Sequence, residues 1–412
     1  MDTRSIIYDG DTSAMPQIHQ ELESAARIRV IGIGGSGKNA INHMVNSKVK
    51  GVDFIVVNTD AQDLQQSVAR TKIHIGKNLT RGLGAGMNPA IGKRAAEETQ
   101  SEIQDTIRNS DMVFIAGGMG GGTCTGAAPI VAKIAKESGA LTVAVVTKPF
   151  SFEGQQRMRL AEQGLEELRK EVDALIVIPN DRLLAVVSRE TTVKSAFAMC
   201  DEVLRQAVEG VSDLITTPGN INLDFADIKA VMEDAGSALM GVGIATGEKR
   251  SEEAARAAIN SPLLDISITG AKGVLLSIAG GEDLGLLEVQ AAASIVTESI
   301  DKNAKVIFGT SRDDRLKKGE IRVTVIATGF PEDGQGARTP LFQAVAAKRT
   351  DKNDDNGSMG KLYNAIIPPT TPKADDDTVP PIKTATEPPK PVDDDDDDWG
   401  AVPAFLRRSK KN

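Results

Sequence analysis

Short apolar runs alternate with helical stretches over the first half of the chain. Runs with the length and composition of strands occupy residues 27–31, 52–57, 111–116, 141–146 and 175–178. Helical stretches follow at about 40–47 and 127–135, the second with Pro129 in its expected first turn. This alternation predicts a mostly parallel, doubly wound α/β sheet.

Residues 192–215 carry the longest helical pattern, which Pro218 and Gly219 end. Apolar side chains recur there every three or four residues: Val193, Phe197, Cys200, Leu204, Ala207, Val211 and Leu214. Further on, β-branched runs at 264–268, 273–278, 304–308 and 321–327, with a helix near 286–300, predict an α+β domain. We therefore expect a flexible arm over 1–26, a first domain over 27–190, a central helix over 191–219 and a second domain over 220–330.

Composition changes sharply from Pro331 onward. Eleven of the 18 prolines lie in 331–412, together with aspartate runs at 375–377 and 393–398. Residues 331–398 are predicted to be a disordered linker, because they cannot bury enough apolar surface to fold. Residues 399–412 differ, since they combine apolar and basic side chains and predict a peptide that folds on a partner. Its candidate contact residues are Pro403, Phe405, Leu406, Arg407 and Arg408.

Overall composition narrows the classes of function. The 412 residues are enough for two domains, and the net charge of −9, without a basic domain, argues against nucleic-acid binding. Cys124 and Cys200 are the only cysteines, which fits a reducing compartment and provides no structural zinc site. We expect a soluble cytoplasmic protein, because no signal peptide or membrane-length apolar run is present.

A glycine-rich segment, GGMGGGTCTG at 117–126, lies between the strand 111–116 and the helix 127–135. Strand, glycine loop and helix start together form a layout that binds phosphate. Glycine lets backbone N–H groups turn toward an anion, and the helix start adds unpaired donors and a positive dipole end. The segment therefore predicts an anion site.

A second glycine loop follows the first strand and matches two motifs. Gly32, Gly34 and Gly37 fit the dinucleotide fingerprint GxGxxG. Gly32, Gly37 and Lys38 also fit most of a P-loop, but Asn39 replaces the hydroxyl residue that would hold magnesium. Each match alone is weak.

The wider arrangement of loops favours a nucleoside triphosphate. Asp60 follows the strand 52–57 and is compatible with the ribose-binding acid of a dinucleotide enzyme. A third glycine loop, however, follows at 82–86, and loops at the C-terminal ends of parallel strands converge. Three such loops can surround a triphosphate, whereas a dehydrogenase needs only one.

Asp224 and Asp227 lie three residues apart at a predicted helix start and project to the same side. They either compensate the helix dipole or form a carboxylate pair that orients a water molecule. The residues alone leave both interpretations open.

Several ordered stretches together resemble the FtsZ family, the bacterial tubulin homologues of cell division. They are GGMGGGTCTGAAP, NTDAQ, GLGAGMNP, PFSFEGQQR, NLDFADIKAVM and VPAFLRR, and the resemblance covers about residues 27–330 and the last dozen. It implies a tubulin-like fold, GTP and Mg²⁺ as ligands, head-to-tail polymerisation into the division ring, and GTP hydrolysis at the junction between subunits. The C-terminal peptide would recruit membrane tethers and regulators.

The resemblance also implies roles for individual residues. Asp224, Asp227 and Asn222 would form the catalytic loop and act on the GTP of the next subunit. Glu153 and Arg157 would hold the ribose, Phe197 would pack on guanine, and Asp201 would accept its N1–H and amino donors. The remaining residues of the GTP site would be Gly34, Gly35, Ser36, Gly37, Lys38, Asn39, Asp60, Gly120, Gly121, Gly122, Thr123, Cys124, Thr125 and Gly126.

Three positions depart from the family pattern. Cys124 stands where glycine is usual, and Ser36 and Lys38 stand where glycine or asparagine is frequent. A cysteine at 124 is strained if the position needs a positive φ, and a thiolate there would repel phosphate. We therefore expect altered turnover with GTP binding retained. Lys38 either adds a favourable charge to the triphosphate or points to solvent.

Two other functions remain open on the sequence alone. A tubulin relative that polymerises without hydrolysing nucleotide would follow from a defective loop at Cys124. An NAD-dependent oxidoreductase would use Gly32, Gly34 and Gly37, but it leaves the other two glycine loops unexplained.

Overall fold

A computed structural model describes residues 26–184, 191–217, 221, 223–261, 267–313 and 316–330. The expected arm up to residue 25, the linker over 331–398 and the peptide over 399–412 lie outside the described residues. So does most of the strand expected at 264–268, whose described residues Ser267 and Ile268 are not in a strand.

The described strands form one sheet of ten, in the order β3-β2-β1-β4-β5-β6-β7-β10-β8-β9. The first seven strands are β1 (Ile28–Ile33), β2 (Val52–Asn58), β3 (Thr71–His74), β4 (Met112–Gly118), β5 (Leu141–Lys148), β6 (Ala174–Pro179) and β7 (Gly236–Thr246). Every neighbouring pair among them is parallel, which confirms the predicted doubly wound sheet.

Helices cover both faces of this parallel part of the sheet, because successive residues of each buried strand point to opposite sides. In β4, Met112 and Phe114 pack in one core with α1 (Gly34–Asn46), α9 (Val193–Thr216) and α10 (Phe225–Met232). Val113 and Ile115 pack in the other core, with helices on the opposite face. Those helices include α4 (Pro89–Glu98), α5 (Gln100–Ile107), α6 (Thr123–Glu137) and α7 (Gln155–Glu171).

The last three strands add a mixed extension to the sheet. β10 (Glu320–Thr328) runs antiparallel to β7 and to β8 (Gly273–Gly280), and β9 (Lys305–Arg312) pairs parallel with β8 at the edge. A third core lies between these strands and the helices α11 (Arg250–Ile259) and α12 (Leu286–Glu298). The expected second α+β domain therefore continues the sheet of the first one, through the β6–β7 pair.

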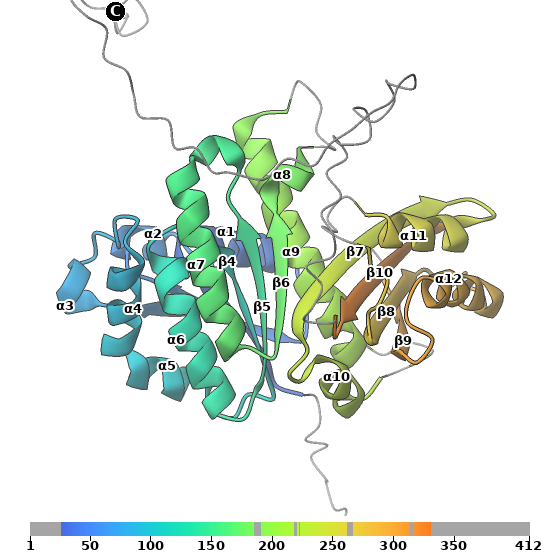
Figure 1. Cartoon of the computed structure of the whole chain (residues 1–412), viewed down its shortest axis with the longest axis horizontal. Helices are drawn as coiled ribbons and strands as arrows, with labels where there is room; N and C mark the ends of the chain where they lie inside the picture. The colour runs from blue at the N-terminus through green and yellow to red at the C-terminus, as the bar shows by residue number, and fades with distance from the viewer. Residues whose placement is uncertain are drawn as a thin grey trace, which may run out of the picture. The chain divides into compact units, whose positions relative to one another are not determined.

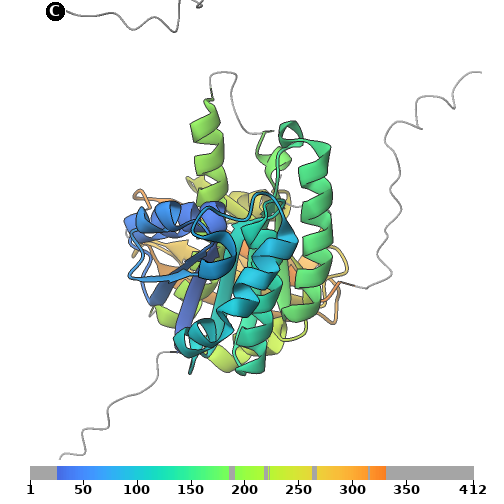
Figure 2. The same cartoon turned by 90° about the vertical axis from the view of Figure 1, so that its left-hand side faces the viewer.

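Helix α9 lies between the two parts (Figure 1). Seen from the side, its first turns project beyond the sheet (Figure 2), and Val193 in the first turn is 67% exposed. Its second half is buried against strands of both parts, which is why its apolar pattern is so regular. The remaining short elements are α2 (Ala61–Gln65), α3 (Lys77–Thr80), α8 (Asn180–Leu183) and a 3-10 turn at Ser151–Glu153.

Candidate active site

Each predicted phosphate loop runs into the first turns of a helix, and residues 119–122 of the second loop form a turn before its helix. Helix α1 begins at Gly34 and α6 at Thr123, earlier than the starts expected near Ala40 and Ala127. Pro129 consequently lies in the second turn of α6, and its expected placement in the first turn is wrong. Glycine-rich sequence hides such starts, because helix propensity counts against it.

The two helix starts lie side by side at the C-terminal ends of β1 and β4, which are adjacent parallel strands. A Cβ placed on Gly34 would lie 3.4 Å from Thr123 Cβ and 3.5 Å from Cys124 N. Two sets of unpaired N–H groups and two positive dipole ends therefore meet at one place. This geometry suits a polyphosphate.

The glycine fingerprint also has a packing function. A Cβ on Gly32 would lie 2.4 Å from the Gly37 carbonyl oxygen, so the strand and the helix approach too closely for a side chain. At Gly120, where φ is 94°, a Cβ would lie 2.7 Å from the Arg157 carbonyl oxygen. These glycines shape the loops around backbone contacts, as well as turning N–H groups outward.

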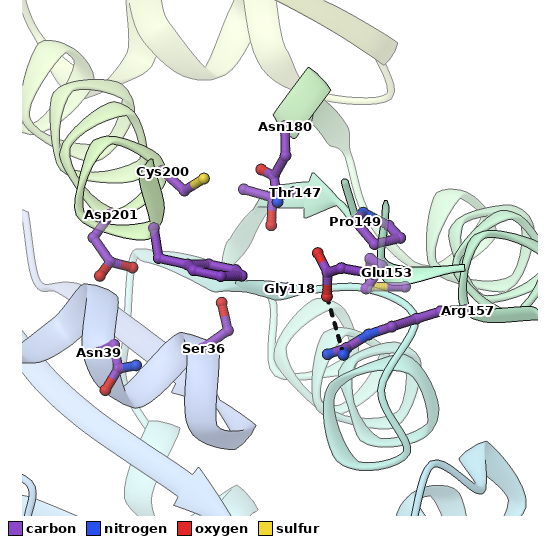
Figure 3. A pocket seen from close by; sticks show the side chains of 12 residues that line it. Ser36, Asn39, Gly118, Thr147, Pro149, Glu153, Arg157, Asn180, Cys200 and Asp201 are labelled. Carbon is purple, nitrogen blue, oxygen red and sulfur yellow. Dashed lines mark ion pairs between the residues drawn. The ribbon is translucent and has the colours of Figure 1, made fainter. Parts of the chain in front are cut away.

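A pocket opens beside the start of α1 (Figure 3). Six residues predicted for the nucleotide site line it: Ser36, Asn39, Glu153, Arg157, Phe197 and Asp201. They come from α1, the turn at 151–153, α7 and α9, so the fold brings together segments far apart in sequence. The other predicted residues lie in the two helix starts, in the turn before α6 or, for Asp60, after β2, and do not line this pocket.

Asp201 stands at the α9 side of the pocket. Burial raises the pKa of its carboxyl group to about 6, and the nearby His43 and Lys38 charges only partly oppose that rise. Its neighbour Phe197 is 40% exposed, and its ring packs edge-on against Phe150 with centroids 5.4 Å apart. The site thus offers an aromatic face next to an ionisable acceptor.

Glu153 and Arg157 form an ion pair on the opposite side of the pocket (Figure 3), with Arg157 Nη1 3.0 Å from Glu153 Oε2. The other Glu153 oxygen accepts a hydrogen bond from the Phe150 N–H at 2.9 Å. Arg157 Nε is buried and has no partner within the described residues. A charged group with an unused donor is well placed for a polar ligand.

Six further residues line the pocket: Gly118, Met119, Thr147, Pro149, Asn180 and Cys200. Gly118 and Met119 belong to the glycine-rich segment 117–126, and the other four have no role predicted from the sequence in this site. Asn180 is 4% exposed, and its Oδ1 has no partner among the described residues. An orphaned buried acceptor is costly unless a ligand satisfies it. Its position in the sequence could have indicated this role, because Asn180 directly follows β6, at the edge where ligands bind such sheets.

Cys124 has neither the strained backbone nor the thiolate charge considered from the sequence. It lies inside α6 and is not among the described residues with positive φ. Burial raises the pKa of its thiol to about 12, so the sulfur is neutral at physiological pH. Both physical reasons for expecting altered turnover therefore fail.

Lys38 does not point to solvent, since it is 7% exposed and its Nζ lies 2.5 Å from Asp63 Oδ1. The alternative of Lys38 as a solvated side chain is thus wrong.

Asp60 is the N-cap of α2, because its Oδ1 accepts a hydrogen bond from the Asp63 N–H at 2.9 Å.

Asp224 and Asp227 lie beyond the far end of α9, at the start of α10. Asp224 is the N-cap of that helix, and its Oδ1 accepts from the Asp227 N–H at 3.0 Å. Both residues are exposed. Asn222 lies outside the described residues. The rise from Asp201 to the end of α9 at Thr216 is about 22 Å, so the two aspartates are remote from the pocket of their own chain.

The described residues contain no group of three or more His, Cys, Asp or Glu side chains arranged to hold a metal ion. None of the helices in this part of the chain has the length and apolar character needed to span a membrane.

Comparisons with known proteins agree with this architecture. Residues 27–188 match the GTPase domain of the Tubulin/FtsZ family, and residues 236–331 match the C-terminal domain of the FtsZ family. Two M. jannaschii FtsZ structures, an empty dimer and a mutant, are each 49% identical with a TM-score of 0.72. The match to the empty dimer covers 75% of this chain and 89% of the M. jannaschii chain. The match to the mutant covers 74% of this chain and 91% of the M. jannaschii chain.

A more distant structure, CetZ1 from Haloferax volcanii in a GDP-bound monomer, shares the fold at 21% identity. Its TM-score is 0.65, with 74% of this chain and 95% of that chain covered. The identity and coverage of the M. jannaschii structures, with both domain matches, leave the dinucleotide interpretation without support. The chain belongs to the FtsZ family and is a tubulin-like, GTP-binding GTPase.

Proposed function

We propose that the pocket binds the guanosine of GTP and that the two adjacent helix starts bind its phosphates. Asp201 would accept hydrogen bonds from guanine N1–H and the amino group, which adenine does not offer in the same arrangement. Phe197 would stack on the base, and Asn180 would satisfy its orphaned acceptor on the nucleoside. Glu153 and Arg157 would hold the ribose. The backbone of residues 34–39 and 120–126 would surround the phosphates.

Mg²⁺ would be held chiefly by phosphate oxygens and water. Once bound, the ion would neutralise charge that develops on the transferred phosphoryl group. The protein's part is to orient the triphosphate and exclude alternative geometries.

The observation that carries the mechanism is the distance between the pocket and the two exposed aspartates. Asp224 and Asp227 lie beyond the C-terminal end of α9, about 22 Å of helix away from Asp201. They are held at the start of α10, which lies at the opposite end of α9 from α8 (Figure 1), and so would not act on the GTP of their own subunit. We propose that they act, with Asn222, on the GTP of the next subunit, where they would orient the attacking water.

A pocket at one end and a catalytic loop at the other define a heterologous contact, which extends into a filament instead of closing. Self-association is in keeping with relatives, since one M. jannaschii FtsZ structure is described as a dimer and CetZ2 from Haloferax volcanii as a GTPγS-bound protofilament. We propose that the filaments form the cytoplasmic division ring. Hydrolysis would weaken the contact, because the γ-phosphate lies within it.

Each part of the chain would have the function expected for it from the sequence. Residues 27–190 would bind GTP, 191–219 would connect the parts, and 220–330 would supply the catalytic loop. Residues 331–398 would serve as a tether, and the peptide 399–412, through Pro403, Phe405, Leu406 and its arginines, would bind membrane-tethering and regulatory division proteins.

Phosphate release from GTP, measured beside pelleting as protein concentration rises, tests the proposal. A threshold concentration is expected for the wild type, and Asp227→Ala should lose turnover but still pellet. Turnover strictly proportional to concentration would place the catalytic groups within one chain. Normal pelleting of the wild type without turnover would instead identify a nucleotide-bound scaffold.

A further inference from the structure

Lys38 and Asp63 form a partly buried ion pair at the base of the phosphate site. Lys38 begins the second turn of α1, between the pocket residues Ser36 and Asn39. Its side chain is 9% exposed, that of Asp63 is 27% exposed, and Nζ lies 2.5 Å from Oδ1. Charges partly shielded from water interact more strongly with their surroundings than fully exposed charges do.

The pair is part of a network that joins the two phosphate-binding helices. Asp63 Oδ2 accepts a hydrogen bond from Asn58 Nδ2 at 2.8 Å, and Asn58 Oδ1 accepts from the Thr59 N–H at 2.9 Å. The Thr59 hydroxyl in turn is 2.7 Å from the hydroxyl of Thr123, the first residue of α6. Lys38 is therefore connected through α2 to the start of the second helix.

The Asp63 carboxylate also lies against the phosphate loop itself. A Cβ placed on Gly35 would be 3.5 Å from Asp63 Oδ2. An uncompensated carboxylate at this place would repel a triphosphate, because like charges only several ångströms apart repel each other strongly near a protein surface. Lys38 cancels that charge.

We propose that Lys38 is a positioning residue for the triphosphate, and that the Lys38–Asp63 pair sets the charge that the phosphates meet. Lys38 neutralises the charge of Asp63 and binds the helix α2 that carries it. Asp63 in turn reduces the positive charge that Lys38 presents to the phosphates. This inference rests on the proposed GTP site, and it concerns two residues to which the preceding mechanism gives no such role. GTP affinity is thus tuned by a pair that does not line the pocket.

Neutralising each partner separately tests the proposal, because a charge-balancing pair predicts opposite effects. Lys38→Met leaves Asp63 unpaired and should weaken GTP binding about tenfold. Asp63→Asn keeps an acceptor for Asn58 but frees the lysine charge, and should strengthen GTP binding severalfold with a steeper dependence on salt. The double variant should recover most of the affinity that Lys38→Met loses.

Isothermal titration of GTP into the full-length protein at two salt concentrations measures these shifts. Lys133→Met and Glu137→Gln form the matched control, because that exposed ion pair on α6 has the same charges and lies outside the site. Neither control should change affinity. If Lys38→Met does not fold, as judged by circular dichroism, Lys38→Gln removes the same charge and retains a donor for Asp63.

A pair that only holds structure would give a different pattern. Both single variants would then lose affinity, and the double variant would be no better than either, which would overturn the proposal. Unchanged affinity in both single variants would overturn it as well. Failure of the wild-type protein to bind GTP would refute the proposed function itself, so the two failures are distinguishable.

Discussion

Nucleotide affinity should fall as the pH is lowered through about 6, because Asp201 must be ionised to accept both guanine donors. Burial raises the pKa of this carboxyl group to about 6, although His43 and Lys38 favour the ionised form. The group is therefore charged above this pH and becomes protonated below it. Replacing it by asparagine should weaken GTP binding and remove its contribution to the pH dependence.

The expected magnitudes follow from the pKa and from the number of hydrogen bonds. With a pKa near 6, the ionised fraction falls from about nine tenths at pH 7 to about one tenth at pH 5, so affinity should drop about tenfold. Hydrogen bonds to a charged group contribute about 1.5–3 kcal/mol each. Because asparagine keeps one acceptor, Asp201→Asn should lose about one such bond and cost about 1.5–3 kcal/mol at pH 7, or roughly 10- to 150-fold in affinity.

Equilibrium titrations with GTP at pH 5, 6 and 7, at constant ionic strength, provide the assay. Phosphate groups also take up protons near pH 6, so the informative quantity is the ratio of wild-type to Asp201→Asn affinity at each pH. This ratio should shrink about tenfold between pH 7 and pH 5. A ratio that stays constant, with both proteins folded by circular dichroism, would refute the role of the carboxylate.

Two further predictions concern stability. Gly117→Ala should destabilise the fold by about 1–3 kcal/mol, because the new Cβ would lie 2.6 Å from Cys124 Sγ. Adding Cys124→Ala should restore part of that loss in urea unfolding, and simple additivity of the two changes would contradict the packing argument. Burial favours protonation of Glu202, but hydrogen bonds from Arg205 and His43 outweigh it and lower the pKa to about 2. The resulting stabilisation, about 1 kcal/mol after allowing for its exposure, is present above pH 4.5 and is lost as the pH falls from there toward 2. Glu202→Gln should therefore make the free energy of unfolding depend less on pH between about 4.5 and 2. An unchanged pH dependence in this range would refute this.

Sequence patterns predict five of the seven parallel strands, since a strand buried on both faces is a continuous apolar run. The four-residue edge strand β3 has no such run and is missed. The strands β1, β2, β4, β5 and β6 all coincide with such runs. The strand β7 escapes prediction because it contains glycine. Gly241 and Gly243 lie there because a Cβ at either place would come within 2.0–2.1 Å of an α11 carbonyl oxygen, a tertiary contact that no local pattern reveals.

The candidate site is predictable only in part, for a similar reason. Motif resemblance points to Ser36, Asn39, Glu153, Arg157 and other residues that carry a recognisable local pattern, and these do meet at one pocket. Asn180, Thr147 and Pro149 belong to strand ends whose convergence depends on sheet order. The Lys38–Asp63 pair depends on the approach of α1 to α2, which only the folded chain defines.

One subunit is proposed to hydrolyse the GTP held by another, and mixing two variants with complementary defects tests this proposal. Asp227→Ala retains the pocket but lacks a catalytic carboxylate, whereas Asp201→Asn retains the loop but binds GTP weakly. Phosphate release is measured for each variant alone and for an equimolar mixture, at a GTP concentration that saturates only the wild-type pocket. The account predicts little turnover from either variant and clear recovery in the mixture, because one supplies GTP and the other the loop. A mixture that releases only the sum of its two components would contradict it.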